Sequence, residues 1–304
     1  MITEDFQDKQ IDKFVLKKVI ARGVFSAIYL AEENNFRKSK NSHENKNHHN
    51  YNPDDKHYSV CKIIPIKKNI IKHKSSKFNK EIKIHRLMHH PNVVQLIDVQ
   101  KDSNYYYVFI EYCSNGDLFN YIYNRNKLTD QESSYFLKQI LIGLKYIHSL
   151  NVAHCDIKPE NILLDASFHA KICDFGTSKI FHHNKNGFTR ATYGSPSYRS
   201  PESLSGHPYD AQKSDIWACG VILFEMATGL CPWSKKSDSN LADQIKNGKY
   251  SIPSDVSDMC ADLIRKLMNV DYKKRIAINE ALNHPFLKNV DINSTKFQHN
   301  VALP

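Results

Sequence analysis

The chain has 304 residues, enough for one large domain or for two packed lobes. Its 41% hydrophobic and 11% aromatic residues are typical of a globular protein and exclude a disordered one, and no apolar run approaches the roughly 20 residues that cross a bilayer. The formal net charge of +10 would suit nucleic acid, membrane or acidic partners. Much of this charge sits in one polar insert and in scattered lysines, so we interpret it as a solvated basic surface.

The cysteines indicate a reduced intracellular protein. Seven of them are spread singly, none forms a C-x-x-C pair and the number is odd, so we expect neither a zinc site nor a disulfide framework. The first residues show no signal peptide, and no glycine follows Met1 for myristoylation. We therefore expect a cytoplasmic protein, with nuclear residence left open.

The first third of the chain has the pattern of a β-sheet. After a predicted extension over residues 1–13, residues 14–30 alternate apolar and polar and turn at Gly23, which predicts a β-hairpin. Residues 34–57 are rich in Asn, His and Lys, which predicts an unstructured insert. Its histidines could bind a metal, but a loop expansion without a ligand is the simpler interpretation. A strand, a helix and two strands are expected next, over 58–65, 76–88, 93–99 and 105–111.

From Leu118 onward helical periodicity dominates. Helices are expected over 118–124, 129–149, 211–229, 238–247, 257–268 and 277–283. The change from strands to helices predicts an α+β fold of two lobes with a ligand cleft between them. The expected organisation is an N-lobe, a hinge, a C-lobe and a polar tail, over 14–111, 112–116, 117–287 and 288–304. The tail has no basic amphipathic helix, so we expect no calmodulin-binding autoinhibitory segment in it.

The segment His154–Asn161, of sequence HCDIKPEN, carries the strongest chemical signal. It resembles the catalytic loop of protein kinases, H-R-D-L-x-x-x-N. Phosphoryl transfer needs an acceptor for the hydroxyl proton and an oxygen ligand for Mg²⁺, and Asp156 and Asn161 fit these two roles. Lys158 can neutralise charge on the moving phosphate. Alone, so short a match would also fit a polar turn or a distant small-molecule kinase.

Two further motifs make the match specific. Asp174-Phe175-Gly176 lies thirteen residues after Asn161, with two short apolar strands predicted between them. In the family that this resembles, the aspartate binds the Mg²⁺ that bridges the β- and γ-phosphates. Lys62 ends an apolar strand, and Glu81 lies on the next predicted helix, ahead of an HHPNVV segment. They resemble the lysine that holds the α- and β-phosphates and its glutamate partner.

Landmarks near the C-terminal end extend the resemblance over residues 14–287. Ser200-Pro201-Glu202 stands where the family has A-P-E, and Arg275 stands where an arginine pairs with that glutamate. Asp215-Ile216-Trp217 resembles the buried helix that anchors the catalytic loop. Lys158 and the stretch from Gly194 to Tyr198 resemble the serine/threonine branch. Residues 194–233 are similar to the calcium/calmodulin-dependent and AMP-activated group of kinases.

The resemblance implies ATP and Mg²⁺ as cofactors and assigns the site residues. The implied catalytic residues are Asp156, Lys158, Asn161, Lys62 and Glu81, and the implied metal ligands are Asn161 and Asp174. The implied nucleotide-binding residues are Ala21, Gly23, Ser26, Ile28, Val60, Lys62, Glu111, Cys113, Asp117, Leu163 and Asp174.

Three departures from the family pattern bear on ATP binding and activation. The glycine-rich loop keeps only its middle glycine, Gly23, so we expect a stiffer loop and weaker ATP affinity. Cys155 replaces the arginine that commonly pairs with an activation-loop phosphate, and Ala191 stands at the usual phosphothreonine position. We therefore expect activity without phosphorylation at that position, with Thr189 and Thr192 as alternative acceptors.

One helical turn after Glu81, His85 stands where the family usually has an apolar residue. We expect its ring to pack against Phe175, unless the helix register is shifted.

The expected substrates are proteins with Ser or Thr acceptors. Three acidic residues, Asp117, Glu160 and Glu225, match positions that often read basic residues before the acceptor, so we expect a preference for upstream Arg or Lys. Ser195 is expected to hydrogen-bond near Asp156. We expect a monomer and neither nucleic-acid nor membrane partners.

Two alternatives remain open at this stage. The eroded glycine loop and Cys155 would also suit an ATP-binding pseudokinase that acts as a scaffold, although Lys62, Asp156 and Asp174 are all present. A small-molecule kinase of related fold is disfavoured by the SPE segment and the peptide-docking part of the activation segment.

Overall fold

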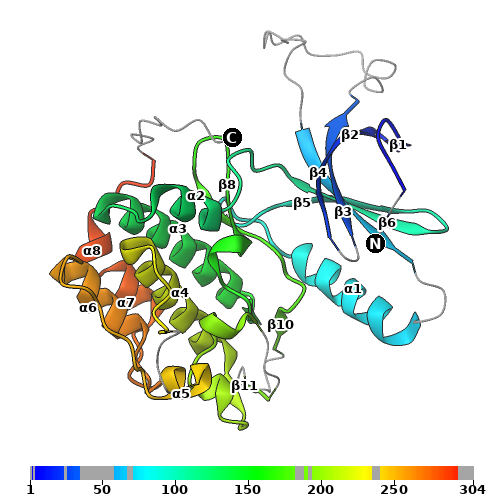
Figure 1. Ribbon diagram of the computed structural model, residues 1–304. Coiled ribbons are helices and arrows are strands. Elements are labelled where there is room, and N and C mark those ends of the chain that lie inside the picture. Colours follow the sequence, from blue (N-terminus) through cyan, green and yellow to red (C-terminus); the bar gives the residue numbers. More distant parts are fainter. Residues whose placement is uncertain are drawn as a thin grey trace, which may run out of the picture. The chain divides into compact units, whose positions relative to one another are not determined.

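The computed structural model describes residues 2, 4–23, 26–34, 58–66, 71–181, 188–190, 194–234 and 240–293, with the backbone alone over 71–76. These ranges leave out most of the predicted insert, Ala191, Thr192 and the end of the predicted tail. The chain divides into two compact units, residues 1–76 with 95–112 and residues 77–94 with 113–304 (Figure 1).

The first unit is a six-stranded antiparallel sheet in the order β1-β2-β3-β4-β6-β5. Its strands are β1 (Gln10–Ile11), β2 (Phe14–Arg22), β3 (Ala27–Glu33), β4 (Tyr58–Pro65), β5 (Leu96–Lys101) and β6 (Tyr105–Glu111). The predicted hairpin around Gly23 and the predicted strand over 58–65 are confirmed. The strand predicted over 93–99 is displaced, because Val93 and Val94 bond to Ile172 in the second unit and the strand starts only at Leu96.

Strand alternation gives this sheet one buried and one half-exposed face. The buried face is filled by Phe14, Leu16, Ala27, Tyr29, Ala31, Cys61, Ile63, Tyr107 and Phe109. Of the predicted extension, Ile2 and Phe6 are buried in this same cluster, and Gln10–Ile11 pairs with β2. The half-exposed face carries the residues between these positions, among them Ile28, Val60 and Lys62.

The second unit is mainly helical. Its helices are α1 (Ile71–His85, which begins at the end of the first unit), α2 (Leu118–Arg125), α3 (Asp130–Ser149), α4 (Ala211–Thr228), α5 (Leu241–Lys246), α6 (Asp258–Leu267), α7 (Ile278–Leu282) and α8 (Pro285–Lys288). The predicted helices agree within three residues except the first, which was placed over 76–88. Polar Lys and Ser residues open α1, so apolar periodicity could not locate its start.

Short strand pairs and single turns carry the connecting segments. The pairs are β7 (Val152–Ala153) with β10 (Lys179–Ile180), β8 (Ile162–Leu164) with β9 (Ala170–Ile172), and β11 (Phe188–Thr189) with β12 (Tyr209–Asp210). The β8–β9 hairpin matches the one predicted between Asn161 and Asp174. Single 3₁₀ turns are η2 (Pro159–Asn161), η3 (Pro196–Tyr198) and η4 (Glu202–Leu204).

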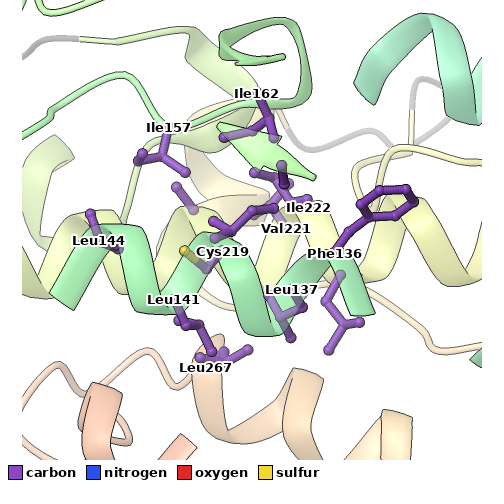
Figure 2. Close-up of a cluster of buried hydrophobic side chains, with 14 of the residues drawn as sticks. Phe136, Leu137, Leu141, Leu144, Ile157, Ile162, Cys219, Val221, Ile222 and Leu267 are labelled. Carbon is purple, nitrogen blue, oxygen red and sulfur yellow. The ribbon is translucent and has the colours of Figure 1, made fainter. Parts of the chain in front are cut away.

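Helices α3 and α4 form the centre of the second unit (Figure 2). Leu137, Leu141 and Leu144 of α3 and Cys219 and Ile222 of α4 belong to one cluster, and every one of these side chains is fully buried. Both helices are capped at their N-termini. Thr129 forms a capping box with Glu132, and the Asp210 side chain accepts hydrogen bonds from the amides of Gln212 and Lys213. The packed pair is therefore a fixed base for the loops at its ends. Over the part of the chain described, no helix has the length and apolarity to span a membrane.

Candidate active site

The predicted catalytic residues of the second unit converge on Asp156, in the loop between β7 and β8. The Ser195 amide and hydroxyl donate to Oδ1 of Asp156 at 2.8 and 3.1 Å. Asn161 donates through Nδ2 to the Asp156 carbonyl oxygen at 2.8 Å and to Oδ2 at 3.1 Å, and Lys158 Nζ lies 3.2 Å from Oδ2. Lys158 also donates to Ser195 Oγ at 2.8 Å. The two bonds from Ser195 to Oδ1 confirm the hydrogen bond expected near Asp156.

Helix α4 holds this loop from its buried side. The carboxylate of Asp215, a 2% exposed residue, accepts from the amides of His154 and Cys155, both at 2.9 Å. His148 donates to the same carboxylate at 2.9 Å. Cys155 has a φ of 66°, in the left-handed region that costs energy for a residue with a Cβ, so the Asp215 bonds hold a strained backbone. The predicted anchoring of the catalytic loop by the Asp215 segment is confirmed.

Asp174 lies next to this loop. The Cys173 amide donates to the Asn161 carbonyl at 2.9 Å, which joins the two predicted metal ligands through neighbouring backbone. Asp174 itself has a φ of 65°, and its Oδ1 accepts from the Gly176 amide at 3.1 Å. This second left-handed residue turns the chain sharply at the candidate ligand.

Two histidine rings pack against Phe175 of the Asp174-Phe175-Gly176 turn. The Phe175 ring is 1% exposed and lies between His85 and His154, with centroid distances of 5.0 and 5.4 Å. His85 donates to the Val94 carbonyl at 2.8 Å, and His154 to the Cys173 carbonyl at 2.9 Å. The expected packing of His85 on Phe175 is confirmed. The polar imidazole can be buried there because it donates to a backbone carbonyl.

Glu81 of α1 lies beside the Asp174-Phe175-Gly176 turn. A Cβ added to Gly176 would lie 3.4 Å from Glu81 Oε2, so the carboxylate borders the Asp174-Phe175-Gly176 turn. Its expected partner, Lys62, is on β4 in the first unit, and the ion pair between them stays a prediction.

Three of the nucleotide-binding residues expected in the first unit share one face of the sheet. Ile28 pairs with Lys62 across β3 and β4, and Val60 is two residues before Lys62, so these three side chains lie on the half-exposed face. Glu111 closes β6 opposite Ser59.

The predicted glycine-rich loop is the turn between β2 and β3, where the Gly23 amide donates to the Ser26 carbonyl at 2.8 Å. Ala21 sits on the β2 side, opposite Ile28. A Cβ on Gly23 would lie 3.3 Å from Ser26 Oγ, so the one remaining glycine is at a close approach.

The remaining nucleotide-binding candidates lie together in the second unit. Asp117 pairs with Leu163 in an isolated antiparallel bridge, and Cys113 is buried four residues earlier. Asp117 also caps α2: its Oδ1 accepts from the Asn120 amide at 2.8 Å and its Oδ2 from Asn120 Nδ2 at 2.9 Å. The cap gives this carboxylate a structural role that the motif did not predict.

The ion pair expected between Glu202 and Arg275 is present and bidentate, with N···O distances of 2.6 and 2.8 Å. The Arg275 side chain is fully buried and also donates to the Lys213 carbonyl at 2.7 Å. Such geometry fixes the activation segment to α4 and to the segment before α7.

A largely enclosed cysteine replaces the family arginine. Burial and the nearby Asp215 carboxylate raise the pKa of the Cys155 thiol, so it is neutral. Two lysines, Lys80 and Lys179, lie near Cys155. Burial and the neighbouring Lys179 ammonium lower the pKa of Lys80. Position 155, where the family has its phosphate-binding arginine, therefore carries no charge in this chain.

Sequence reasoning missed the partner of Glu225. The Tyr198 hydroxyl donates to Glu225 Oε2 at 2.8 Å. Burial raises the pKa of Glu225 to about 7, the Tyr198 bond opposes this, and Glu160 adds to it. No sequence signal links two residues 27 positions apart, although Tyr198 lies in the GSPSY stretch that resembles the serine/threonine branch.

Comparisons with known proteins agree with this geometry. The protein kinase domain family matches residues 48–287, more than three quarters of the chain. A probable serine/threonine-protein kinase of Dictyostelium discoideum is 40% identical over 210 residues, 69% of this chain and 25% of its own length. The SNF1-related protein kinase catalytic subunit alpha KIN12 of Arabidopsis thaliana is 39% identical over 213 residues, 70% of this chain and 42% of its own.

A third relative, the serine/threonine-protein kinase GIN4 of Saccharomyces cerevisiae, is 40% identical over 214 residues, 69% of this chain and 18% of its own length. In all three cases the match spans less than half of the curated relative. The family match begins after β2 and β3, which carry the degenerate glycine loop.

Proposed function

Because this chain belongs to the protein kinase domain family, among the serine/threonine kinases, we propose that it is an active enzyme that phosphorylates protein hydroxyls. The observation that carries the proposal is the set of bonds on Asp156, which orients a carboxylate beside the Lys158 ammonium and the Asn161 amide. The substrate oxygen forms a bond to the γ-phosphorus of ATP, the bond from that phosphorus to the bridging oxygen breaks, and ADP leaves.

Each residue near Asp156 has a role in that step. The Asp156 carboxylate orients the substrate hydroxyl and accepts its proton. The Lys158 ammonium, 3.2 Å from Asp156 Oδ2, stabilises negative charge on the moving phosphate. The Ser195 hydroxyl bridges the two charged groups and sets their separation.

The residues present fit magnesium. Magnesium prefers oxygen ligands and usually takes one or two carboxylates together with substrate phosphates. Asp174 offers a carboxylate, and Asn161, whose amide nitrogen is bonded to Asp156, offers its amide oxygen. No group of three or more His, Cys, Asp or Glu side chains that could hold a metal occurs in the described residues. When bound, Mg²⁺ neutralises charge on the β- and γ-phosphates.

The nucleotide roles follow the family pattern. On this proposal Lys62 would hold the α- and β-phosphates with Glu81 as its expected partner, and the turn at Ala21, Gly23 and Ser26 would cover the phosphates. Ile28 and Val60 line the adenine site from the sheet. The other adenine and ribose contacts come from Glu111, Cys113, Leu163 and Asp117.

We propose that activity does not depend on phosphorylation at the usual activation-loop position. That position is Ala191, and the neutral Cys155 thiol stands where the phosphate receiver would be. The Asp215 bonds already fix the catalytic loop from α4. A Thr189→Ala/Thr192→Ala enzyme should keep its transfer rate, and loss of activity in it would contradict this proposal.

We propose a preference for substrates with Arg or Lys before the acceptor. Support comes from two neighbouring carboxylates, Glu160 and Glu225, whose mutual repulsion an arginine would relieve. Peptide-library profiling should show enrichment of Arg or Lys, and Glu160→Gln should weaken it. A flat profile upstream of the acceptor would exclude the preference.

The decisive experiment is transfer of ³²P from [γ-³²P]ATP with Mg²⁺ to a basic serine peptide. The protein is made in bacteria, treated with phosphatase and compared with Asp156→Asn, which should lower kcat by about 10²–10⁴-fold. The matched control is Asp165→Asn, in the β8–β9 turn, which should transfer like wild type. If wild type shows no transfer but is stabilised by ATP and Mg²⁺, the scaffold alternative is supported. Phosphate on a small alcohol and none on protein would support the small-molecule alternative.

A further inference from the structure

The strand that leads into the glycine turn has little packing of its own. Phe14 and Leu16 are fully buried, but residues 18–22 are all exposed. Two register shifts interrupt the pairing of β2 with β3 between Leu16 and Ala21. Within this exposed stretch, the side chain of Arg22, directly before Gly23, does contact other segments.

Arg22 is bonded to the beginning of the described chain. Its Nη1 donates to the carbonyl oxygens of Ile2 and Glu4 at 3.2 and 3.3 Å. Its Nη2 donates to the Tyr29 hydroxyl at 3.1 Å and lies 4.0 Å from Asp5 Oδ1. A planar guanidinium with its donors in a fixed fork suits such a set of acceptors.

The segment that supplies these acceptors is itself fixed. Phe6 is 1% exposed and makes edge contacts with the rings of Tyr29, Tyr105 and Tyr107, at centroid distances of 6.0, 5.0 and 6.5 Å. The Tyr105 hydroxyl donates to Glu4 Oε2 at 2.7 Å. Burial of an aromatic ring in the sheet core makes this segment an anchor for Arg22.

The Tyr29 hydroxyl joins the two parts. It accepts from the Phe6 amide at 3.2 Å and from Arg22, and it donates to Asp5 Oδ1 at 2.9 Å. Its ring is fully buried on β3, so its hydroxyl has a fixed position. Arg22 is thus tied to the beginning of the described chain and, through pairing with Ala27, to the other side of the turn.

We propose that Ile2 and Glu4–Phe6 form a strap that positions the nucleotide-binding turn through Arg22. The proposal rests on the proposed function, because it assigns Arg22 as a positioning residue for the turn that covers ATP. With the strap in place, Arg22 at the start of the turn is held in one position before ATP binds, which lowers the entropy lost on binding. The strap restrains the one segment that the residues of β2 leave unpacked.

The first experiment measures the restraint without nucleotide, by hydrogen exchange of the amides in residues 19–28. Arg22 is exposed enough that Arg22→Ala should fold. It should speed exchange about tenfold, because several bonds to a charged group are lost. Asp5→Ala, whose side chain is 70% exposed, should act in the same direction, and the two changes should not add. The matched control is Lys18→Ala on the same exposed stretch. If Arg22→Ala exchanges like Lys18→Ala, the strap does not exist.

The second experiment measures KM for ATP and kcat. Arg22→Ala should raise KM about five- to tenfold with a smaller change in kcat, because the turn must be ordered on binding. Arg22→Lys keeps the charge but not the fork, so it should resemble Arg22→Ala. Full rescue by lysine, or an unchanged KM despite faster exchange, would overturn the proposal. If wild type transfers no phosphate, the proposed function fails, but the exchange experiment still decides whether the strap exists.

Discussion

The amide and the hydroxyl of Ser195 both donate to the same oxygen, Oδ1, of Asp156. The other oxygen, Oδ2, receives Asn161 and lies beside Lys158. The activation segment therefore orients one edge of the carboxylate and the catalytic loop orients the other. The chemistry expected at Asp156 depends on a residue 39 positions away.

Ser195→Ala should lower kcat about tenfold with little change in KM for ATP. The alanine keeps the amide bond to Asp156 but loses the hydroxyl that bridges Asp156 and Lys158, which is worth about 1–1.5 kcal/mol of orientation. Ser195→Thr keeps the bridge and should stay within about twofold of wild type. Steady-state kinetics on a serine peptide checks both variants, and an alanine variant as fast as threonine would refute the bridge.

Arg275→Ala should destabilise the fold by roughly 3–5 kcal/mol, because it leaves the nearly buried Glu202 carboxylate without its cation. Chemical denaturation of the second unit, followed through Trp217 and Trp233, measures the loss. Glu202→Gln combined with Arg275→Met removes both charges and should recover a large part of it. If the double variant is no more stable than Arg275→Ala, loss of packing is responsible, and the unpaired charge is not.

The preference for an upstream arginine should increase between pH 6 and pH 8. Burial raises the pKa of Glu225 to about 7, so the side chain is mostly neutral below that pH and a carboxylate above it. Only the carboxylate attracts a cation, so the kcat/KM ratio of an arginine peptide to its neutral analogue should rise with pH. In Glu225→Gln the ratio should lose this dependence. A ratio that rises equally in both enzymes would assign the titration to another group.

Gly220→Ala should destabilise the protein by up to about 2 kcal/mol although alanine favours helices. A Cβ on Gly220 of α4 would lie 2.8 Å from Leu267 Cβ and 2.6 Å from Met268 Cγ, at the end of α6. Overpacking of this kind costs about 1–3 kcal/mol, against about 1 kcal/mol gained in helix propensity. A thermal melt compares the variants. An unchanged Tm would show that α4 and α6 can separate slightly without loss.

Much of the fold and of the catalytic centre was predictable, because motif spacing carries long-range information. Asp156, Asn161 and Asp174 fall in one match, and their proximity in the second unit follows from a short hairpin whose apolar residues are visible in the sequence. The Glu202–Arg275 pair, 73 residues apart, was also predictable from its position relative to those motifs.

Contacts without a periodic or motif signal were not predictable. Phe6 is a single aromatic residue in a polar stretch, so nothing in the sequence indicates that it enters the sheet core. Helix α8 has four residues, too few for a repeat, and is identified only by its His284 cap and Pro285. The second role of Asp117, as the cap of α2, could by contrast have been predicted, because Asp is a preferred N-cap residue and the helix was expected to start at the next position.

The surroundings of Cys155 have a consequence for evolution and design. Restoring an arginine at this position would place a third cation beside Lys80 and Lys179, on a backbone already in the left-handed region. The repulsion among these three cations would push the segments that carry them apart until a bound anion neutralised the charge. If the chain is active without activation-loop phosphorylation, as we propose, Cys155→Arg should thus make its activity depend on an acidic ligand.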